Sequence, residues 1–109
     1  MMFKGDLLDL VISGRKTQTR RLHKHALKEG QAYNLKKNWY ENTGYYIRIK
    51  KVYPQKLGDI SEEEARKEGF SSLDEFRDAW IRINGRWNPD IVVTVYEFNL
   101  VDLKQSRLT

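Results

Sequence analysis

The residues best suited to chemistry stand close together near the N-terminus, in the nine-residue stretch from Gly14 to Leu22, which reads GRKTQTRRL. This stretch holds four cationic side chains and two hydroxyls, and it directly follows an apolar run. If it forms a strand from position 17, its side chains alternate between two faces, so that Thr17, Thr19 and Arg21 share one face. Lys16 stands at the preceding turn and could swing back over Thr19. These groups together predict a wall that binds a polar, planar or anionic ligand.

A lysine and a threonine at this spacing could hydrolyse an acyl or amide bond. A threonine hydroxyl becomes nucleophilic when a base takes its proton, and a partly desolvated lysine can be that base because burial lowers its pKa. A carboxylate is also needed to position a substrate amine or to carry a proton. Glu68 is the candidate, since it closes a predicted helix beside a glycine. Two plainer interpretations stay open: a solvated basic edge strand, and a solvated glutamate at a helix end.

RNA binding is the second chemistry that the residues allow. Basic side chains could follow phosphates while tyrosines stack on bases, although tyrosine is also common in ordinary strands. Trp80 and Trp87 could alternatively form a ligand platform, with Trp80 also suited to the core. The candidate RNA contacts are Lys16, Arg20, Arg21, Lys36, Lys37, Arg48, Lys50, Lys51, Tyr33, Tyr40, Tyr45 and Tyr46.

Charge is unevenly divided along the chain. Residues 1–51 carry 12 Lys and Arg against 4 Asp and Glu, a net charge of +8, whereas residues 52–109 carry 8 against 11, a net charge of −3. The whole chain has a formal net charge of +5. A basic half indicates an anionic partner, most simply nucleic acid or a nucleotide.

Length and composition narrow the class of protein. The 109 residues suit a single domain, 1–109, and the absence of cysteine excludes disulfides and thiolate metal sites. His23 and His25 lack acidic neighbours, so we expect no metal and no cofactor. No apolar run approaches the ~20 residues of a membrane span, and the N-terminus has acids where a signal peptide has cations. We therefore expect a soluble, cytoplasmic protein with no membrane partner, and favour a monomer.

The order of local signals predicts an α+β domain with a curled antiparallel or mixed sheet. Helical spacing of apolar residues predicts a helix from Gly5 to Gly14, and two Ser-x-x-Glu capping boxes predict helices from Ser61 to about Glu68 and from Ser72 to Ile83. Leu73, Phe76, Trp80 and Ile83 form the apolar stripe expected of the last of these helices. Strands are expected at residues 1–4, 17–22, 32–37, 45–57 and 91–100, with turn chemistry at 38–44 and a polar tail from 102.

The strand expected at residues 45–57 alternates in character. One face would carry Tyr46, Arg48 and Lys50, and the other Tyr45, Ile47, Ile49 and Lys51. Pro54 interrupts this strand, which predicts a bulge, a bend or an edge position, because proline cannot donate to a sheet ladder.

The pattern Gly14-x-Lys16-x-x-Thr19-x-Arg21, directly after a helix, resembles the strand motif of the ASCH domain, a member of the PUA-like superfamily. The usual motif reads Gly-x-Lys-x-x-Glu-x-Arg. The resemblance covers nearly the whole chain and includes Glu68-Gly69-Phe70, the following helix, a Trp-x-Pro loop and a Val-x-x-Phe strand. It implies a small β-barrel flanked by helices, with a cleft beside the motif.

Thr19 stands where most members of the family have glutamate. The bacterial ASCH proteins that share the reading Gly-Arg-Lys-Thr-x-Thr-x-Arg include an amidohydrolase that deacetylates N4-acetylcytidine through a lysine, a threonine and a glutamate. The resemblance carries these roles to Lys16, Thr19 and Glu68. Lys16 would activate Thr19, and Glu68 would orient the base of a nucleoside or RNA partner. Further substrate contacts would come from Arg21, Thr17 and Arg20, without a metal or cofactor.

Other ASCH domains are known or suspected RNA binders, and a ribonuclease activity has been proposed for some. A non-catalytic RNA-binding module is therefore the main alternative, and a ribonuclease is a weaker one. An enzyme predicts Lys16 near hydrogen-bonding distance of Thr19, with Glu68 across a closed cleft. A binder predicts an open groove continuous with Lys36 and Arg48. Its nucleic-acid contacts would be the mainly basic set Lys36, Lys37, Arg48, Lys50 and Tyr46.

Overall fold

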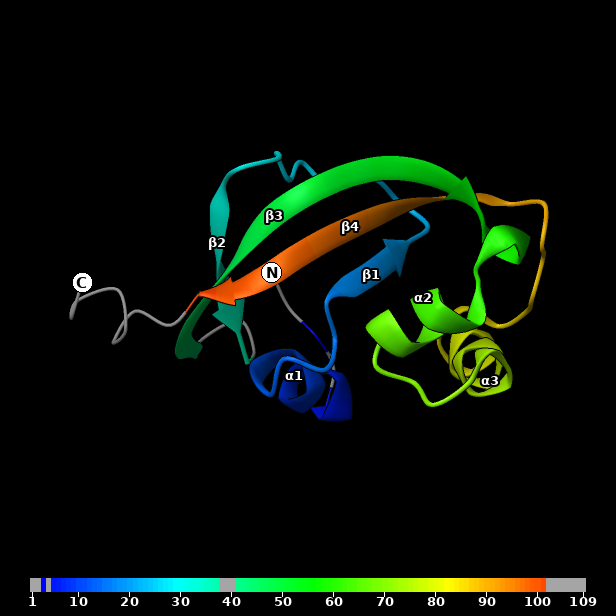
Figure 1. Cartoon of the computed structure of the whole chain (residues 1–109), viewed down its shortest axis with the longest axis horizontal. Coiled ribbons are helices and arrows are strands. Elements are labelled where there is room, and N and C mark those ends of the chain that lie inside the picture. The colour runs from blue at the N-terminus through cyan, green and yellow to red at the C-terminus, as the bar shows by residue number, and fades with distance from the viewer. Residues whose placement is uncertain (1–2, 4, 38–40, 102–109) are drawn as a thin grey trace.

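In the part of the chain that the computed structural model describes, residues 3, 5–37 and 41–101, a four-stranded antiparallel sheet arches over three helices (Figure 1). This is the α+β fold with a curled sheet that the sequence predicted. The strand expected at residues 1–4 and the tail from 102 fall outside the described residues, apart from Phe3, which lies in no strand. The elements are α1 (Gly5–Ile12), β1 (Gln18–Arg21), β2 (Ala32–Lys36), β3 (Asn42–Lys56), the 3-10 turn η1 (Leu57–Asp59), α2 (Glu62–Lys67), α3 (Leu73–Asn84) and β4 (Val92–Val101).

The strand order β1-β4-β3-β2 places β4 inside the sheet and β1 at one edge. Both faces of β4 are covered, since Val95 and Tyr96 point to opposite faces and each is 0% exposed. The first half of β3 pairs with β2, and its second half pairs with β4 as far as Lys56 opposite Val92. Pro54 lies in that second half, beyond the β2 pairing. Its missing N–H therefore costs no bond to β2, which confirms the edge position.

Irregularities in β3 overturn two local expectations. The register with β4 shifts between Ile49 and Lys51, so two residues of β3 oppose one of β4. Lys51 is consequently exposed and does not share the buried face of Ile49, as strict alternation had predicted. Asn42 to Gly44, expected in a turn, belong to β3, where Gly44 has a φ of 84° and the Thr43 hydroxyl donates to the carbonyl of residue 35 at 2.7 Å. The rest of that predicted turn, residues 38–40, lies outside the described residues.

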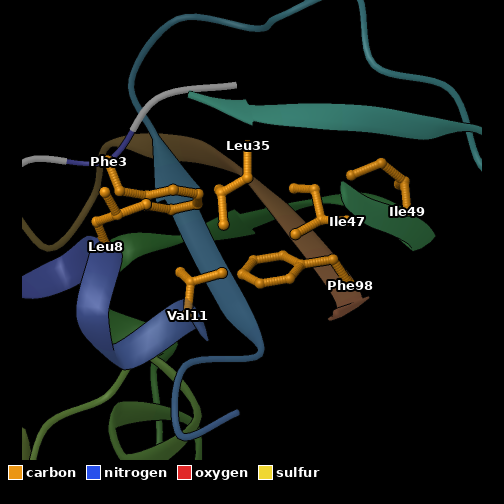
Figure 2. Packing of buried hydrophobic residues seen from close by; sticks show 7 residues of the cluster. All are labelled: Phe3, Leu8, Val11, Leu35, Ile47, Ile49 and Phe98. Atoms are coloured by element: carbon orange, nitrogen blue, oxygen red, sulfur yellow. The ribbon is translucent and has the colours of Figure 1, made fainter. Parts of the chain in front are cut away.

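One hydrophobic cluster joins α1 to the sheet (Figure 2). Leu8 and Val11 of α1 pack among aromatic and branched side chains from the strands, and Val11 is fully buried. Burial of such a side chain contributes roughly 1.5–3 kcal/mol. The helix ends before Gly14, whose φ of 83° an L-residue rarely adopts. The buried members of the cluster are Phe3, Leu8, Val11, Leu35, Ile47, Ile49 and Phe98.

A second cluster joins α2 and α3 to the other end of the sheet. Both helices begin at the predicted caps: the Ser61 hydroxyl accepts from the Glu64 N–H, and the Ser72 hydroxyl accepts from the Glu75 N–H. The buried members are Leu57, Ile60, Ala65, Phe76, Trp80 and Val93.

The buried face of α3 differs from the predicted stripe. Phe76, Ala79 and Trp80 are buried, but Ile83 is 56% exposed, because the last turn of α3 faces a pocket and not the core. The ring of Trp87 packs edge-on against Phe76, with centroids 6.2 Å apart. This contact makes Trp87 part of the second cluster.

Candidate functional site

Backbone contacts bring Lys16 and Glu68 together although they are 52 positions apart in sequence. The turn after α1 is held by the Lys16 N–H, which donates to the Leu10 carbonyl at 3.0 Å. The next residue, Thr17, donates its N–H to the Lys67 carbonyl at 2.7 Å, which ties the start of β1 to the end of α2. Glu68 is the C-terminal cap of α2 and therefore lies directly beside Lys16.

Gly69 completes this approach. Its φ of 101° lies in the left-handed region that L-residues avoid. A Cβ at this position would lie 2.9 Å from Leu10 Cδ1 and 3.5 Å from Lys16 Cβ. The turn after α2 can therefore press against α1 and Lys16 only because residue 69 has no side chain.

Lys16 and Glu68 form a buried ion pair. Lys16 Nζ donates to Glu68 Oε1 at 2.6 Å and to the Glu68 carbonyl oxygen at 2.9 Å. Each residue is 3% exposed, so Glu68 is not the solvated helix-end glutamate that remained open from the sequence. Burial lowers the pKa of the Lys16 amine, and this effect outweighs the opposing attraction of Glu68.

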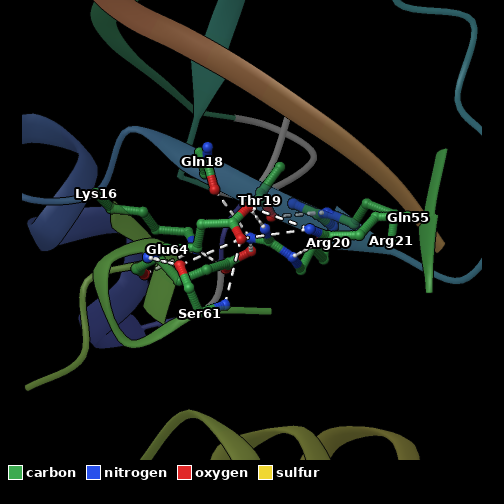
Figure 3. A network of polar contacts seen from close by, with 9 residues as sticks. Lys16, Gln18, Thr19, Arg20, Arg21, Gln55, Ser61 and Glu64 are labelled. Atoms are coloured by element: carbon green, nitrogen blue, oxygen red, sulfur yellow. Dashed lines mark hydrogen bonds and ion pairs between the residues drawn. The ribbon is translucent and has the colours of Figure 1, made fainter. Parts of the chain in front are cut away.

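Arg20 holds the other side of the same carboxylate. Its Nη1 donates to Glu68 Oε2 at 3.0 Å, and its Nη2 donates to Glu64 Oε2 at 2.6 Å. Nη1 also donates to Gln18 Oε1 at 3.0 Å, and Nε donates to Gln55 Oε1 at 2.9 Å (Figure 3). The Arg20 side chain is 0% exposed, so β1 is an edge strand but not a solvated one. This guanidinium, expected among the substrate and phosphate contacts, lines the pocket and is hydrogen-bonded to Glu68.

Sequence reasoning did not identify three members of this network, Gln18, Gln55 and Glu64. Glu64 had a visible role in the Ser61 capping box, and it performs that role while also pairing with Arg20. Gln18 stands two positions before Arg20, so strand alternation places both side chains on one face. Their shared face was the available signal.

Thr19 and Arg21 lie on the opposite face of β1 from Arg20. Arg21 Nε donates to Thr19 Oγ1 at 3.3 Å, so the hydroxyl accepts there and its own hydrogen is directed elsewhere. The Arg21 guanidinium lies 5.2 Å from the centroid of the Phe3 ring, and burial lowers its pKa. Thr19 itself is 4% exposed.

The expected approach of Lys16 to Thr19 is not observed as a hydrogen bond. Within the described residues, both hydrogen bonds of the Lys16 ammonium go to Glu68. The physical reason is that a buried ammonium needs a charged acceptor, which a hydroxyl cannot supply. Thr19 and the ion pair nevertheless line one pocket.

That pocket has a volume of about 730 Å³. Its lining includes the polar side chains of Lys16, Thr19, Arg20, Arg21 and Glu68, together with the exposed residues His23, His25 and Lys37. A concave space lined by apolar side chains and a few polar groups is typical of small-molecule sites. The apolar and neutral side chains that complete the lining are Phe3, Leu7, Leu22, Phe70, Phe76, Ala79, Trp80, Ile83 and Asn84.

The remaining candidate residues lie apart from the pocket. Thr17 does not line it, and its backbone serves instead as a link between α2 and β4, accepting from the Phe98 N–H at 3.0 Å. Of the basic set proposed for RNA, Lys37 lines the pocket, whereas Lys36, Arg48, Lys50 and Tyr46 do not. Lys50 and Arg48 are exposed, and Arg48 donates to the carbonyl of residue 30 at 2.7 Å.

Two other kinds of feature are absent from the described part of the chain. No group of three or more His, Cys, Asp or Glu side chains there could hold a metal ion. No helix within the same residues is long and apolar enough to cross a membrane.

Comparison with known proteins decides the family. The sequence model of the ASCH domain matches residues 1–102. This chain belongs to the ASCH domain family. The match confirms the family expected from the strand motif, and an ASCH domain of known structure has the same PUA-like arrangement of curled sheet and helices.

Solved structures share the ASCH fold at low sequence identity. An ASCH domain from Lactobacillus crispatus JV V101 aligns with a TM-score of 0.73 and 20% identity, covering 87% of this chain and 70% of that one. A protein from Enterococcus faecalis V583 aligns with a TM-score of 0.68 and 24% identity, covering 93% of this chain and 78% of that one. The ASCH protein from Zymomonas mobilis aligns with a TM-score of 0.65 and 11% identity, covering 99% of this chain and 75% of that one. Such identities show the fold alone, and no curated protein matches the chain.

Proposed function

We propose that this ASCH domain is an amide hydrolase that removes the acyl group from an N4-acylated cytosine nucleoside. The observation that carries the proposal is the buried Lys16–Glu68 pair, which lines the same pocket as Thr19. These three residue types supply a base, an acid and a nucleophile. The resemblance of the motif to that of the N4-acetylcytidine amidohydrolase supports the choice of substrate.

Thr19 is the proposed nucleophile. Neutral Lys16 takes the hydroxyl proton as Thr19 Oγ1 attacks the acyl carbonyl carbon, and Arg21 donates to the oxyanion that develops. The carbon–nitrogen bond then breaks, and the proton held by Lys16 passes to the departing N4 amine. Thr19 is left as an acyl ester. Water attacks this ester with Lys16 again accepting a proton, which releases the carboxylic acid and restores the hydroxyl.

Glu68 is the proposed orienting group. Its two carboxylate oxygens already accept from Lys16 and Arg20, but each oxygen has a second lone pair with which it can accept an N–H of the substrate. The apolar wall that includes Phe70 and Trp80 offers flat surfaces for a pyrimidine ring.

The direct test is to incubate the protein with N4-acetylcytidine and follow the release of cytidine. We expect turnover by the wild-type protein and a loss of at least about a hundredfold in Thr19→Ala, since the covalent route cannot proceed without its nucleophile. Thr17→Ala is the matched control, because Thr17 lies outside the pocket and should retain activity. An inactive wild-type protein, or an undiminished Thr19→Ala variant, would rule the proposal out.

RNA binding by the basic surface is the second candidate. The observation in its favour is that Lys50 and Arg48 are exposed on β3, while Lys37 lines the pocket, so cations lie on both surfaces. This candidate predicts an affinity for single-stranded RNA that falls with salt and weakens in Lys50→Gln. A flat binding curve at low salt would exclude it.

A further inference from the structure

We propose that Arg20 is a positioning residue of the hydrolase, which acts on the reaction through the Glu68 carboxylate and not by touching the substrate. The inference rests on the proposed function for two roles, those of Glu68 as the orienting group and of Lys16 as the base. The guanidinium has two effects. It fixes the direction of the carboxylate, and it shares the negative charge that Lys16 would otherwise face alone.

The burial of Arg20 favours this indirect role. The residue lines the pocket, but its side chain is 0% exposed and offers a substrate little surface. A buried charge is tolerated when it is paired and hydrogen-bonded, so the guanidinium has to keep its partners. Glu68 is the partner that lines the pocket with it. An effect of Arg20 on a ligand therefore passes through Glu68.

Three partners besides Glu68 hold the Arg20 guanidinium (Figure 3). Nε donates to Gln55 Oε1 at 2.9 Å, and Nη1 donates to Gln18 Oε1 at 3.0 Å. Nη2 donates to Glu64 Oε2 at 2.6 Å. These partners belong to β3, β1 and α2, so the position of the guanidinium is fixed by three elements. Gln55 Nε2 also donates to Glu64 Oε2 at 3.2 Å, which links two of the partners to each other.

The fixed guanidinium in turn holds the Glu68 carboxylate. Arg20 Nη1 donates to Oε2 at 3.0 Å while Lys16 Nζ donates to Oε1 at 2.6 Å, so each oxygen has one donor in a set position. A carboxylate held at both oxygens directs its remaining lone pairs along set directions. Groups that orient a substrate need such support, because a misplacement of about 1 Å can cost about a hundredfold in rate.

Arg20 also changes the electrostatic surroundings of Lys16. The charges of the network alternate in sign along the order Lys16, Glu68, Arg20, Glu64. Burial is the largest cause of the lowered pKa of Lys16; Glu68 at the end of α2 opposes it, and the positive charges of Arg21 and Arg20 on β1 add to it. The proposed base has to be neutral to accept the hydroxyl proton. Arg20 therefore favours the reactive form of Lys16.

A charge-balanced double variant tests this role without leaving a buried charge unpaired. Arg20→Gln alone leaves Glu68 and Glu64 with one positive partner, Lys16, and is expected to destabilise the fold. Arg20→Gln combined with Glu64→Gln removes one charge of each sign and keeps the Lys16–Glu68 pair. A glutamine at position 64 also preserves the capping box of α2, which accepts either residue there. Circular dichroism should show that the double variant is folded at the assay temperature.

The kinetics of the double variant separate positioning from other roles. We expect kcat for N4-acetylcytidine to fall at least about tenfold with KM nearly unchanged, because Glu68 loses its support while the substrate loses no contact. The rise of kcat/KM with pH should move to higher pH, since Lys16 holds its proton more tightly without Arg20. Wild-type kinetics, a loss of activity without this movement, or a higher KM with kcat unchanged would each overturn the proposal.

Glu64→Gln alone is the matched control. Arg20 remains in this variant and can donate to the new amide oxygen, while one negative charge is lost. The rise of kcat/KM should therefore stay where it is in the wild-type protein or move to lower pH. Movement to higher pH, as far as in the double variant, would assign the effect to Glu64 and refute the role of Arg20.

A titration of Lys16 gives a readout that needs no turnover. NMR of labelled lysine side chains, with Lys16→Met to assign the signal, measures its pKa in each protein. We expect a higher pKa in the double variant than in the wild-type protein, because the positive charge of Arg20 is gone, and an equal value would refute the electrostatic link. An inactive wild-type protein rules out the hydrolase even if the titration shifts, whereas an active one with no shift rules out the role of Arg20 alone.

Discussion

Lys16 and Glu68 depend on each other as a buried pair. Removing one charged partner of such a pair typically costs about 3–5 kcal/mol, because the other charge remains in the interior without compensation. Arg20 also pairs with the Glu68 carboxylate at 3.0 Å, so part of the stability lost on substituting Glu68 comes from the lost contact with Arg20. The interaction energy between Lys16 and Glu68 is therefore best measured by a double-mutant cycle and not by single substitutions.

We expect Lys16→Met and Glu68→Gln each to lower the free energy of unfolding, and the double variant to lose less than the sum. A coupling of about 1–3 kcal/mol is typical of residues in direct contact. Urea denaturation of the four proteins measures it. Additive losses would show that the 2.6 Å contact between Lys16 and Glu68 does not stabilise the folded protein in solution.

The lowered pKa of Lys16 makes a prediction about pH. Burial favours the neutral amine, so Lys16 loses its proton at a lower pH than an exposed lysine does. If neutral Lys16 is the base, kcat/KM for acyl release rises with pH through this lowered pKa and levels off below the ordinary lysine range. The pH profile of the wild-type protein measures this. Lys16→Arg stays charged and should lose the activity, and a pH-independent rate would contradict the role of Lys16 as the base.

At the scale of elements, local signals predicted where helices and strands lie. The serine caps of α2 and α3, the glycine stop after α1 and the β-branched closing strand all follow from neighbours in sequence. The motif likewise indicated Lys16 and Thr19. The local rules failed at Lys51, where a bulge interrupts alternation, and at Ile83, where the helix faces a pocket. Those features depend on which segments pair, and periodicity does not contain that information.

The same limit explains the unpredicted part of the site. Gln55 and Glu64 reach Arg20 across 35 and 44 positions of sequence, and Lys16 reaches Glu68 across 52. The preference of Lys16 for Glu68 over Thr19 also depends on burial, which the motif alone does not reveal.

The turn at Gly69 packs closely against α1, and substitution of this glycine tests that contact. Gly69→Ala would place a methyl group 2.9 Å from Leu10 Cδ1 at a φ of 101°, whereas Gly85, with a φ of 92°, has open space around it. Gly85→Ala therefore isolates the backbone cost, which is about 1–2 kcal/mol for a left-handed residue. We expect Gly69→Ala to be the more destabilising in thermal unfolding, because it adds a steric contact that the Leu10 side chain must move to relieve. Equal shifts in Tm would show that Leu10 moves aside freely.

At the scale of the whole molecule, the polar network lies between two hydrophobic clusters. One cluster fixes α1 against the sheet, and the other fixes α2 and α3 at the far end of the arch (Figure 1). β1 and the end of α2 meet between them, where the Thr17 N–H donates to the Lys67 carbonyl, so the buried charges lie between two packed clusters. A fold does not by itself determine a function, so the function must be argued from this site.

The position of a bound substrate tests the account most directly. We predict that a crystal structure of Thr19→Ala with N4-acetylcytidine will show the acyl carbonyl carbon facing position 19 and the N4 atom within hydrogen-bonding distance of Glu68, inside the pocket. A ligand bound on the exposed β3 surface around Arg48 and Lys50, with the pocket unoccupied, would contradict the hydrolase and favour an RNA-binding module.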